Sequence, residues 1–298
     1  MDIRYLPAAE IDKVKWNSCV HYAPNGNVCG YKWYLDATAR EWDGLVEGDY
    51  ESVLPLPRRK DWTGRKEVFI PVLMREAGIY SINVLSRERI TAFLAAVPKE
   101  YGKVQIELNA PTKLPPETSF TAREKIDYLL ALDRPYEELA GEFSRNLLLT
   151  LEKAEQTGLK PVANLKPEKV AAFYKKHAPA HPEKERIFHA AQRIMYNVLH
   201  RGWGFAAGVQ SSEGDLLAAD FYIYSHTRVL RLLPVVSAVG KRVGALEYLT
   251  NTLLRTHAGK QLVLDFNTEK REEFAPKFGA IEQPYQVIKR DNRLLKIG

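Results

Sequence analysis

The sequence predicts an α+β protein in which a mixed, mostly antiparallel sheet flanked by helices is present twice along the chain. Three observations lead to this prediction. The chain has 298 residues, of which 45% are hydrophobic and 27% charged, so it is long enough for two folded domains. Its strand-like runs are joined by hairpin turns, unlike a doubly wound parallel sheet. Each half also passes from a short strand through helices into a hairpin, further strands and a late helix.

The first half, residues 1–134, is predicted from turn and capping signals. Gly48-Asp49 separates two strand-like runs and indicates a hairpin. Ser86 can cap a helix, and Glu88 favours its first turn. The expected strands are 2–6, 42–47, 50–57, 68–73, 104–109 and 126–132, and the expected helices are 9–22, 31–39 and 86–97.

The second half, residues 135–298, begins where Pro135 fits the first turn of a long helix that would end at Gly158. We therefore place the domain boundary between residues 134 and 135. The expected helices are 136–157, 166–177, 183–201, 245–257 and 269–277, and the expected strands are 160–164, 204–210, 215–225, 229–237, 262–266 and 285–290.

The charge balance suits an anionic ligand. The chain carries 43 basic and 37 acidic residues, a net charge of +6. Nucleotides, tRNA and phosphate-bearing precursors are ligands that such a surplus attracts. A basic surface that serves solubility alone is the alternative interpretation.

Cysteine, histidine and hydropathy patterns restrict the class of protein further. Cys19 and Cys29 lack metal-ligand spacing, so we expect free, buried thiols. His177 and His181 have no third ligand nearby, so we expect no metal. No apolar run is long enough to span a bilayer and the first residues have no leader pattern, so we expect a cytoplasmic protein.

A phosphate-binding site is predicted between residues 228 and 279. A strand over 229–237 leads into Gly240-Lys241-Arg242-Val243-Gly244, and a helix follows. Glycines at a helix start expose N–H groups to an anion, and the positive end of the helix dipole faces it. Lys241 and Arg242 add charge that can meet phosphate oxygens.

At these residues the sequence resembles a known family. The second half resembles the catalytic-type half of the FemAB-like, peptidyltransferase-like branch of the GNAT (acyl-CoA N-acyltransferase) superfamily. The residues that carry this resemblance are Arg145, Lys153-Ala154-Glu155, Gly158, Leu230–His257, Asp265-Phe266 and Phe274-Ala275-Pro276-Lys277-Phe278-Gly279. The first half is similar to GNAT-like proteins through Tyr31–Asp36, Leu54–Pro57, Ile70-Pro71 and Gly78-Ile79.

The resemblance implies two tandem GNAT-like lobes, 1–134 and 135–298, with the donor bound by the second. It implies an N-acyltransferase that moves an acyl or aminoacyl group to an amine by direct attack in a ternary complex. The donor would be acetyl-CoA or another acyl-CoA, with aminoacyl-tRNA as the alternative. The acceptor would be a small-molecule or peptide amine, and a cell-wall precursor is among those implied.

The resemblance implies that the pantetheine arm of the donor would lie between two splayed parallel strands, 229–237 and 262–266. The loop 240–245 would bind the pyrophosphate of the donor. Leu246 departs from the family's usual glycine or alanine in this loop, and no long helical arm is inserted into the second half. The implied donor-binding residues are Leu233, Val235, Lys241, Arg242, Gly244, Ala245 and Asn267.

Candidates for proton transfer lie on one predicted strand. Asp220, Tyr222, Tyr224 and His226 alternate and so share one face of a sheet. Asp220 could act as a general base and either tyrosine as an acid. The alternative is that the tyrosines are half-buried strand residues with satisfied hydroxyls. Asp265 could reach a ligand or cap the turn that follows it.

Candidates for substrate binding lie in the first half. Arg58, Arg59 and Lys60 precede Trp62 in a hairpin that could clamp phosphates or stack on a base. The alternative interpretation is that these residues form the solvated tip of a hairpin. Lys32 and Tyr34 could face the acceptor, although an aromatic stripe on a helix is also typical of a core. Two other functions stay open, a non-catalytic scaffold with an anionic pocket and a tRNA-binding module.

Overall fold

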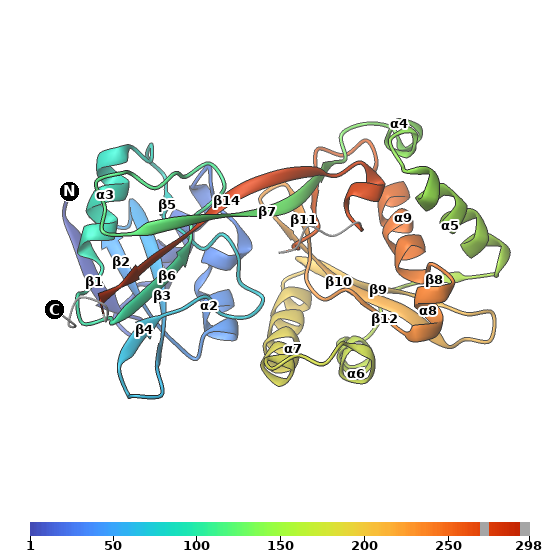
Figure 1. Ribbon diagram of the computed structural model, residues 1–298, viewed down its shortest axis with the longest axis horizontal. Helices are drawn as coiled ribbons and strands as arrows, with labels where there is room; N and C mark the ends of the chain where they lie inside the picture. The colour runs from blue at the N-terminus through green and yellow to red at the C-terminus, as the bar shows by residue number, and fades with distance from the viewer. Residues whose placement is uncertain (269–273, 293–298) are drawn as a thin grey trace. The chain divides into compact units, whose positions relative to one another are not determined.

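The computed structural model of the protein describes residues 1–268 and 274–292. The chain divides into two compact units, unit 1 with residues 1–125 and 284–298 and unit 2 with residues 126–283 (Figure 1). Strands β7 (Thr121–Ala131) and β14 (Ile281–Asp291) each contribute residues to both units. The bounds of these units differ from a single division at residue 134, and the predicted domain bounds, 1–134 and 135–298, stay a prediction.

Unit 1 contains a sheet with the strand order β1-β2-β3-β4-β6-β14, and β5 pairs with β3. The strands not yet given are β1 Ile3–Pro7, β2 Glu41–Glu47, β3 Ser52–Lys60, β4 Lys66–Val68, β5 Tyr80–Ser81 and β6 Lys103–Glu107. The helices are α1 Lys13–Tyr22, η1 Val28–Gly30, α2 Lys32–Thr38 and α3 Arg87–Ala96. The predicted hairpin at Gly48 is confirmed, because β2 and β3 pair antiparallel from Glu47 and Ser52 onward.

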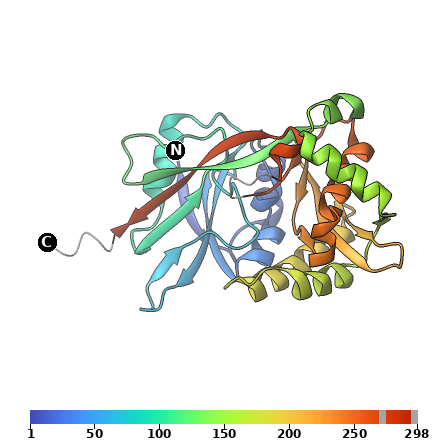
Figure 2. The ribbon, with the colours of Figure 1, turned by 45° about the vertical axis from the view of Figure 1, so that its right-hand side comes forward.

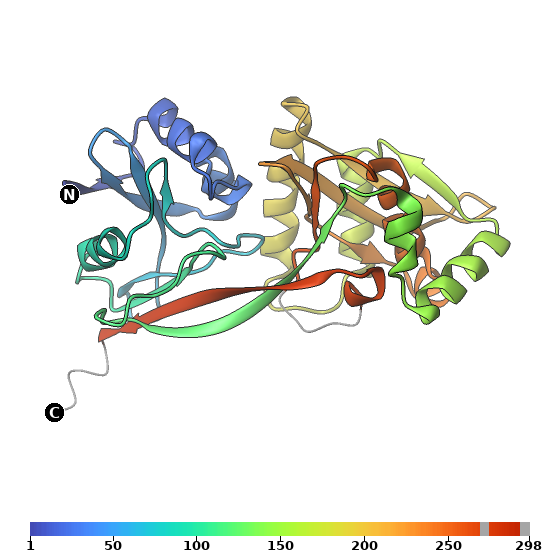
Figure 3. The ribbon, with the colours of Figure 1, turned by 90° about the horizontal axis from the view of Figure 1, so that it is seen from above.

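The faces of this sheet follow from the alternation of side chains along β2. Gly44 faces Trp16 of α1, since a Cβ at Gly44 would lie 2.6 Å from that ring. Leu45 faces the other way and packs in a core cluster with Phe93 of α3. α1 and α3 therefore cover opposite faces of the sheet (Figure 3). Ser86 caps α3 as predicted, because its side chain accepts a hydrogen bond from Arg89 N.

Unit 2 contains a sheet with the strand order β7-β13-β11-β10-β9-β8, and β12 pairs with β10. Its other strands are β8 Lys160–Ala163, β9 Gly204–Gln210, β10 Leu216–Ser225, β11 Arg228–Arg231, β12 Val235–Val236 and β13 Val263–Asp265. Its helices are α4 Tyr136–Gly141, α5 Arg145–Gln156, α6 Pro167–His177, α7 Lys184–His200, α8 Ala238–Arg242, α9 Ala245–His257 and η2 Pro276–Phe278. α5 and α9 cover one face, and α6 and α7 the other (Figure 2).

Two predicted elements of unit 2 are broken by local chemistry. The predicted helix 136–157 is wrong as a single helix, because the side chain of Ser144 accepts a hydrogen bond from Leu147 N and starts α5 anew after α4. The predicted strand 229–237 is split into β11 and β12 around Pro234, which has no N–H to donate to a neighbouring strand. The predicted helix 269–277 lies mostly outside the described residues.

Candidate functional site

The two strands that the family resemblance implies for the donor site pair in parallel over a short length. β11 and β13 are paired from Arg228↔Val263 to Leu230↔Asp265. One further link follows, from Asn267 Nδ2 to the carbonyl of Arg231 at 2.8 Å. Beyond it, β12 pairs only with β10 among the described residues. We call the place where this parallel pairing ends, at residues 231–236 and 265–267, the fork.

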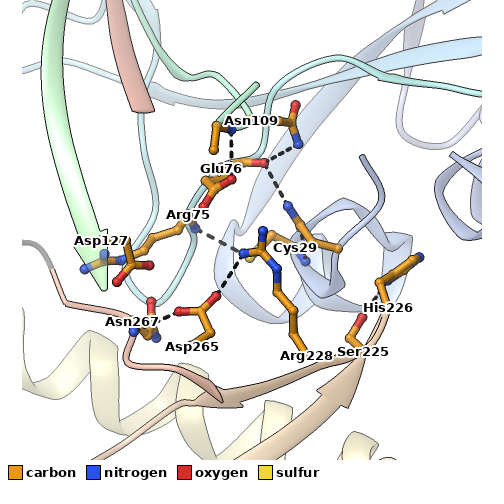
Figure 4. Close-up of polar contacts among 12 residues, drawn as sticks. Cys29, Arg75, Glu76, Asn109, Asp127, Ser225, His226, Arg228, Asp265 and Asn267 are labelled. Atoms are coloured by element: carbon orange, nitrogen blue, oxygen red, sulfur yellow. Dashed lines mark hydrogen bonds and ion pairs between the residues drawn. The ribbon is translucent and has the colours of Figure 1, made fainter. Parts of the chain in front are cut away.

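Polar side chains converge at the base of the fork. Arg228 Nη1 lies 3.1 Å from Asp265 Oδ2 (Figure 4). The backbone N–H of Asn267 donates to Asp265 Oδ1 at 2.9 Å, and that of Thr268 donates to Asp127 Oδ1 at 3.0 Å. Asn267 has a φ of 51°, a left-handed conformation that asparagine tolerates better than most residues. These contacts turn the chain away from β11 directly after β13.

The predicted glycine loop contains a short helix, α8. The side chain of Ser237 caps it by accepting a hydrogen bond from Gly240 N at 3.0 Å. A Cβ at Gly240 would lie 2.3 Å from the carbonyl oxygen of Leu217, so this glycine permits close packing on β10. Gly244 starts α9 with a φ of 71°, and a Cβ there would lie 2.4 Å from Thr150 Cγ2 of α5. Both glycines therefore have a packing role.

The other predicted donor-binding residues surround the fork in different ways. Lys241 and Arg242 are exposed on α8. Leu233, Val235 and Ala245 are buried, and Asn267 is half-buried at the base of the fork. Three of these residues are therefore buried apolar residues near the fork, and Lys241 and Arg242 are exposed cations just before α9.

Asp220, the predicted base, forms a buried ion pair. Its Oδ2 lies 2.8 Å from Arg231 Nε, and its Oδ1 accepts hydrogen bonds from the backbone N–H groups of Phe221 and Leu233. Burial raises the pKa of the Asp220 carboxyl, and the charge of Arg231 opposes this shift. The guanidinium also stacks over Phe266 and Phe274, at 5.6 Å and 5.0 Å from the ring centroids.

Tyr222 pairs across the sheet with Arg231 and lies on the same face as Asp220. Its side chain is fully buried, and among the described residues its hydroxyl has no hydrogen-bond partner. Burial raises the pKa of this hydroxyl well above its ordinary value, and the negative charge of Asp220 adds to the shift. The phenol is therefore protonated at neutral pH.

Tyr224 hydrogen-bonds a histidine that sequence reasoning did not single out. Its hydroxyl lies 2.6 Å from His257 Nε2, and His257 Nδ1 lies 2.9 Å from the carbonyl oxygen of Leu253. Because that carbonyl can only accept, Nδ1 carries the proton and Nε2 of the neutral ring accepts from Tyr224. Burial lowers the pKa of His257, which favours this neutral form. The spacing of Leu249, Leu253 and His257 is the sequence pattern that could have placed His257 on the buried face of α9.

Arg231 is the second functional candidate that the sequence did not single out. It is 3% exposed, and among the described residues its Nη2 has no hydrogen-bond partner. No local pattern marks an arginine that ends a buried strand, because its partner Asp220 comes from the neighbouring strand. His226, which the alternation placed with the tyrosines, lies in the β10–β11 turn at a φ of 48°, with Nδ1 2.8 Å from Ser225 Oγ.

In unit 1 the predicted substrate-binding residues are engaged with neighbours. Arg58 pairs with Glu41 and, through Nε at 2.6 Å, with the buried Asp43. Arg59 Nε lies 2.6 Å from Glu67 Oε1, and its guanidinium stacks over Phe69.

The two candidates on α2 are also engaged within unit 1. Lys32 lies over Trp42, with its Nζ 5.2 Å from the ring centroid. Tyr34 is fully buried and its hydroxyl donates to the carbonyl of Leu73. Their role in acceptor binding stays a prediction.

Two further properties concern metals and membranes. Within residues 1–268 and 274–292, no three His, Cys, Asp or Glu side chains are grouped so that they could hold a metal ion. In the same part of the chain, none of the helices combines the length and the apolar character that crossing a membrane requires.

Known structures resemble this chain over nearly its whole length. No protein-family model matches the sequence, and no curated protein matches it. The crystal structure of FemX has a TM-score of 0.65 at 12% identity, covering 96% of this chain and 97% of that one. The structure of L-PGS from Bacillus licheniformis has a TM-score of 0.58 at 13% identity, covering 95% and 93%.

A third similar structure is a tandem GNAT protein from the clavulanic acid biosynthesis pathway, with a TM-score of 0.54 at 14% identity, covering 97% of this chain and 98% of that one. At such identities the likeness concerns the fold alone. The predicted α+β class with two GNAT lobes is confirmed, and the predicted resemblance to the FemAB-like branch is confirmed at the level of structure. The chain has a tandem GNAT fold that is similar to the fold of FemX.

Proposed function

We propose that the protein is an N-acyltransferase that moves an acyl or aminoacyl group to an amine in a ternary complex. The observation that carries this proposal is the fork: β11 and β13 pair in parallel as far as Leu230 and Asp265, after which β12 stays paired with β10 and the other chain segment turns at Asn267. A channel between diverging parallel strands can hold an extended thioester or ester donor, with its carbonyl near the base of the fork. The fold shared with FemX and a tandem GNAT protein supports the same chemistry.

In this proposal the donor is an acyl-CoA, with aminoacyl-tRNA as the alternative. Leu233, Val235 and Ala245 line the channel, Asn267 closes its base, and Lys241 and Arg242 meet the phosphates. Gly244 has no side chain and so allows α9 to begin close to Thr150 of α5. An incoming neutral amine forms the C–N bond as the C–S or C–O bond breaks. The leaving group takes up one proton, and the amine nitrogen releases one proton to solvent, so the step balances.

The three predicted catalytic residues have different parts in this proposal. Tyr222 supplies the proton to the leaving group, since its hydroxyl has no partner among the described residues. Asp220 holds Arg231 in place, because all its described contacts are to donors of the protein itself. Tyr224 is bonded to His257 and is the alternative acid.

The proposed acceptor is a small-molecule or peptide amine, with Lys32, Tyr34, Arg58 and Arg59 of unit 1 as candidate contacts. A cell-wall precursor belongs to this class of acceptor. The hairpin that follows Arg59 also presents Trp62, which is 94% exposed and can stack on a nucleobase. This exposure favours tRNA as the second donor to test.

Thermal unfolding of the full chain with coenzyme A, acetyl-CoA and charged tRNA tests the proposal. A ligand at a hundredfold excess over its Kd adds about 2.7 kcal/mol to the free energy of unfolding. We expect one donor to raise Tm, and Lys241→Glu with Arg242→Glu to remove the rise. Both side chains are exposed, so the variant should fold normally.

The matched control is Lys153→Glu with Lys169→Glu, which changes the charge equally at exposed positions of α5 and α6. It should keep the donor's effect on Tm. If none of the three ligands changes Tm, the scaffold alternative replaces the transferase.

A further inference from the structure

Unit 2 contains a pocket of about 300 Å³ beneath α9, separate in its lining from the residues assigned to the donor. Sheet strands β8, β9 and β10 form its floor. This volume is at the lower end of the range for small-molecule sites. Its lining is mostly apolar and includes Phe205, Tyr222, Tyr224, Leu253, His257 and Lys260.

Aromatic rings form the inner wall of this pocket. Phe205 stacks on Tyr222 with ring centroids 5.1 Å apart, and it lies parallel to the His257 ring at 6.1 Å. Two polar groups interrupt the apolar wall, the hydrogen-bonded pair of Tyr224 and His257 and the buried phenol of Tyr222. A ligand here thus meets an apolar surface with a few fixed polar atoms.

One cation lies at the rim. Lys260 is exposed, and it forms no ion pair within the described part of the chain. Its charge acts on His257, since it contributes to lowering the pKa of that imidazole. The neutral His257 carries no charge of its own, so the rim is positive and no carboxylate contributes to the lining.

We propose that this pocket binds a small carboxylic acid with an apolar body, such as a medium-chain fatty acid. The chain lies against Phe205 and Leu253, and the carboxylate pairs with the Lys260 ammonium. A phosphate-rich ligand would leave the apolar wall unused, and an amine would be repelled by Lys260. The pocket shares Tyr222 and Tyr224 with the proposed catalytic residues but none of the donor-binding residues, so binding of the acid can be tested apart from binding of the donor.

Calorimetric titration of the full chain with decanoate tests this proposal. We expect one molecule bound per chain, and movement of the His257 imidazole NMR signals on binding. Ala163→Trp, at the exposed rim on β8, should weaken binding at least tenfold by filling the mouth. Thr256→Trp blocks the same mouth from the side of α9. It serves as the test variant if Ala163→Trp does not fold. Val239→Trp, at an exposed position of α8, is the control and should bind normally.

The charge argument is tested separately. Lys260→Gln should weaken decanoate about threefold to fivefold, the value of a partly exposed ion pair, whereas Lys153→Gln should not. Decylamine and decanoyl-CoA are the competing probes. The proposal is overturned if decanoate does not bind, if folded Ala163→Trp and Thr256→Trp bind it normally, if decylamine binds equally well, or if only decanoyl-CoA binds.

Discussion

Asp220 Oδ2 lies 2.8 Å from Arg231 Nε, and both side chains are almost completely buried on adjacent strands of one sheet. The pair is located where β11 ends and the fork begins. An isolated charge in such surroundings would be strongly unfavourable, so each residue requires the other.

Replacing Asp220 by Ala should lower the free energy of unfolding by about 3–5 kcal/mol, because Arg231 is left buried without its counter-charge. Urea denaturation measures the change. Asp215→Ala removes an exposed carboxylate before the same strand, and we expect a change within about 0.5 kcal/mol. The pairing argument fails if Asp220→Ala loses less than about 1 kcal/mol.

Gly244→Ala should destabilise the protein by about 1–3 kcal/mol, since alanine is strained at a φ of 71° and its Cβ would meet Thr150 Cγ2. Thr150→Ser removes that methyl group and should recover part of the loss in the double variant. Gly214→Ala is the matched control, because Gly214 has a φ of 93° and nothing within 4 Å of a Cβ. Equal losses at both glycines would refute the steric contribution.

The stability of the protein should fall as pH is lowered through about 6.5, the ordinary pKa of histidine. Burial lowers the pKa of His257 in the folded state, so the unfolded chain takes up a proton first and is favoured by acid. His257→Gln should reduce this loss between pH 7 and 5, measured by denaturation at each pH. His189→Gln, on the exposed surface of α7, should leave it unchanged. Identical pH profiles for the wild type and His257→Gln would disprove the assignment.

Cys19 should resist alkylation in the folded protein at pH 8. Burial raises the pKa of its thiol to about 12, so the reactive thiolate is scarce. Cys29 is also buried, and neither cysteine is in a disulfide, as the sequence predicts. Mass spectrometry after iodoacetamide treatment should show no modification until denaturant is added. Rapid labelling of Cys19 without denaturant would contradict its buried position.

Sequence patterns predicted those features that depend on neighbouring residues. The turn at Gly48, the capping of α3 by Ser86 and the whole of α9 follow from capping, turn chemistry and periodicity, which act within a few residues. The tandem fold followed from the order of these elements and from the family resemblance, and the similar structures confirm it.

Those local patterns could not predict which side chains of different strands and helices would contact each other. The Asp220–Arg231 ion pair joins two strands, and the Tyr224–His257 hydrogen bond joins a strand to a helix 33 residues later. The break in the predicted helix 136–157 is different, because the Ser144 cap that starts α5 is local, and only the contact of the Phe143 ring with that of Phe278, with centroids 5.5 Å apart, depends on a distant residue.

The sequence by itself determined the class of fold, its helices and hairpins, and the glycine-and-basic segment before α9, because these depend on local backbone preferences and on the spacing of apolar residues. Only the tertiary structure decided what the segment's glycines do and which polar groups meet. Gly240 and Gly244 allow close packing against β10 and α5, and Arg231 and His257 acquire their roles from partners on other elements. The physical reason is that close packing and burial act between segments distant in sequence.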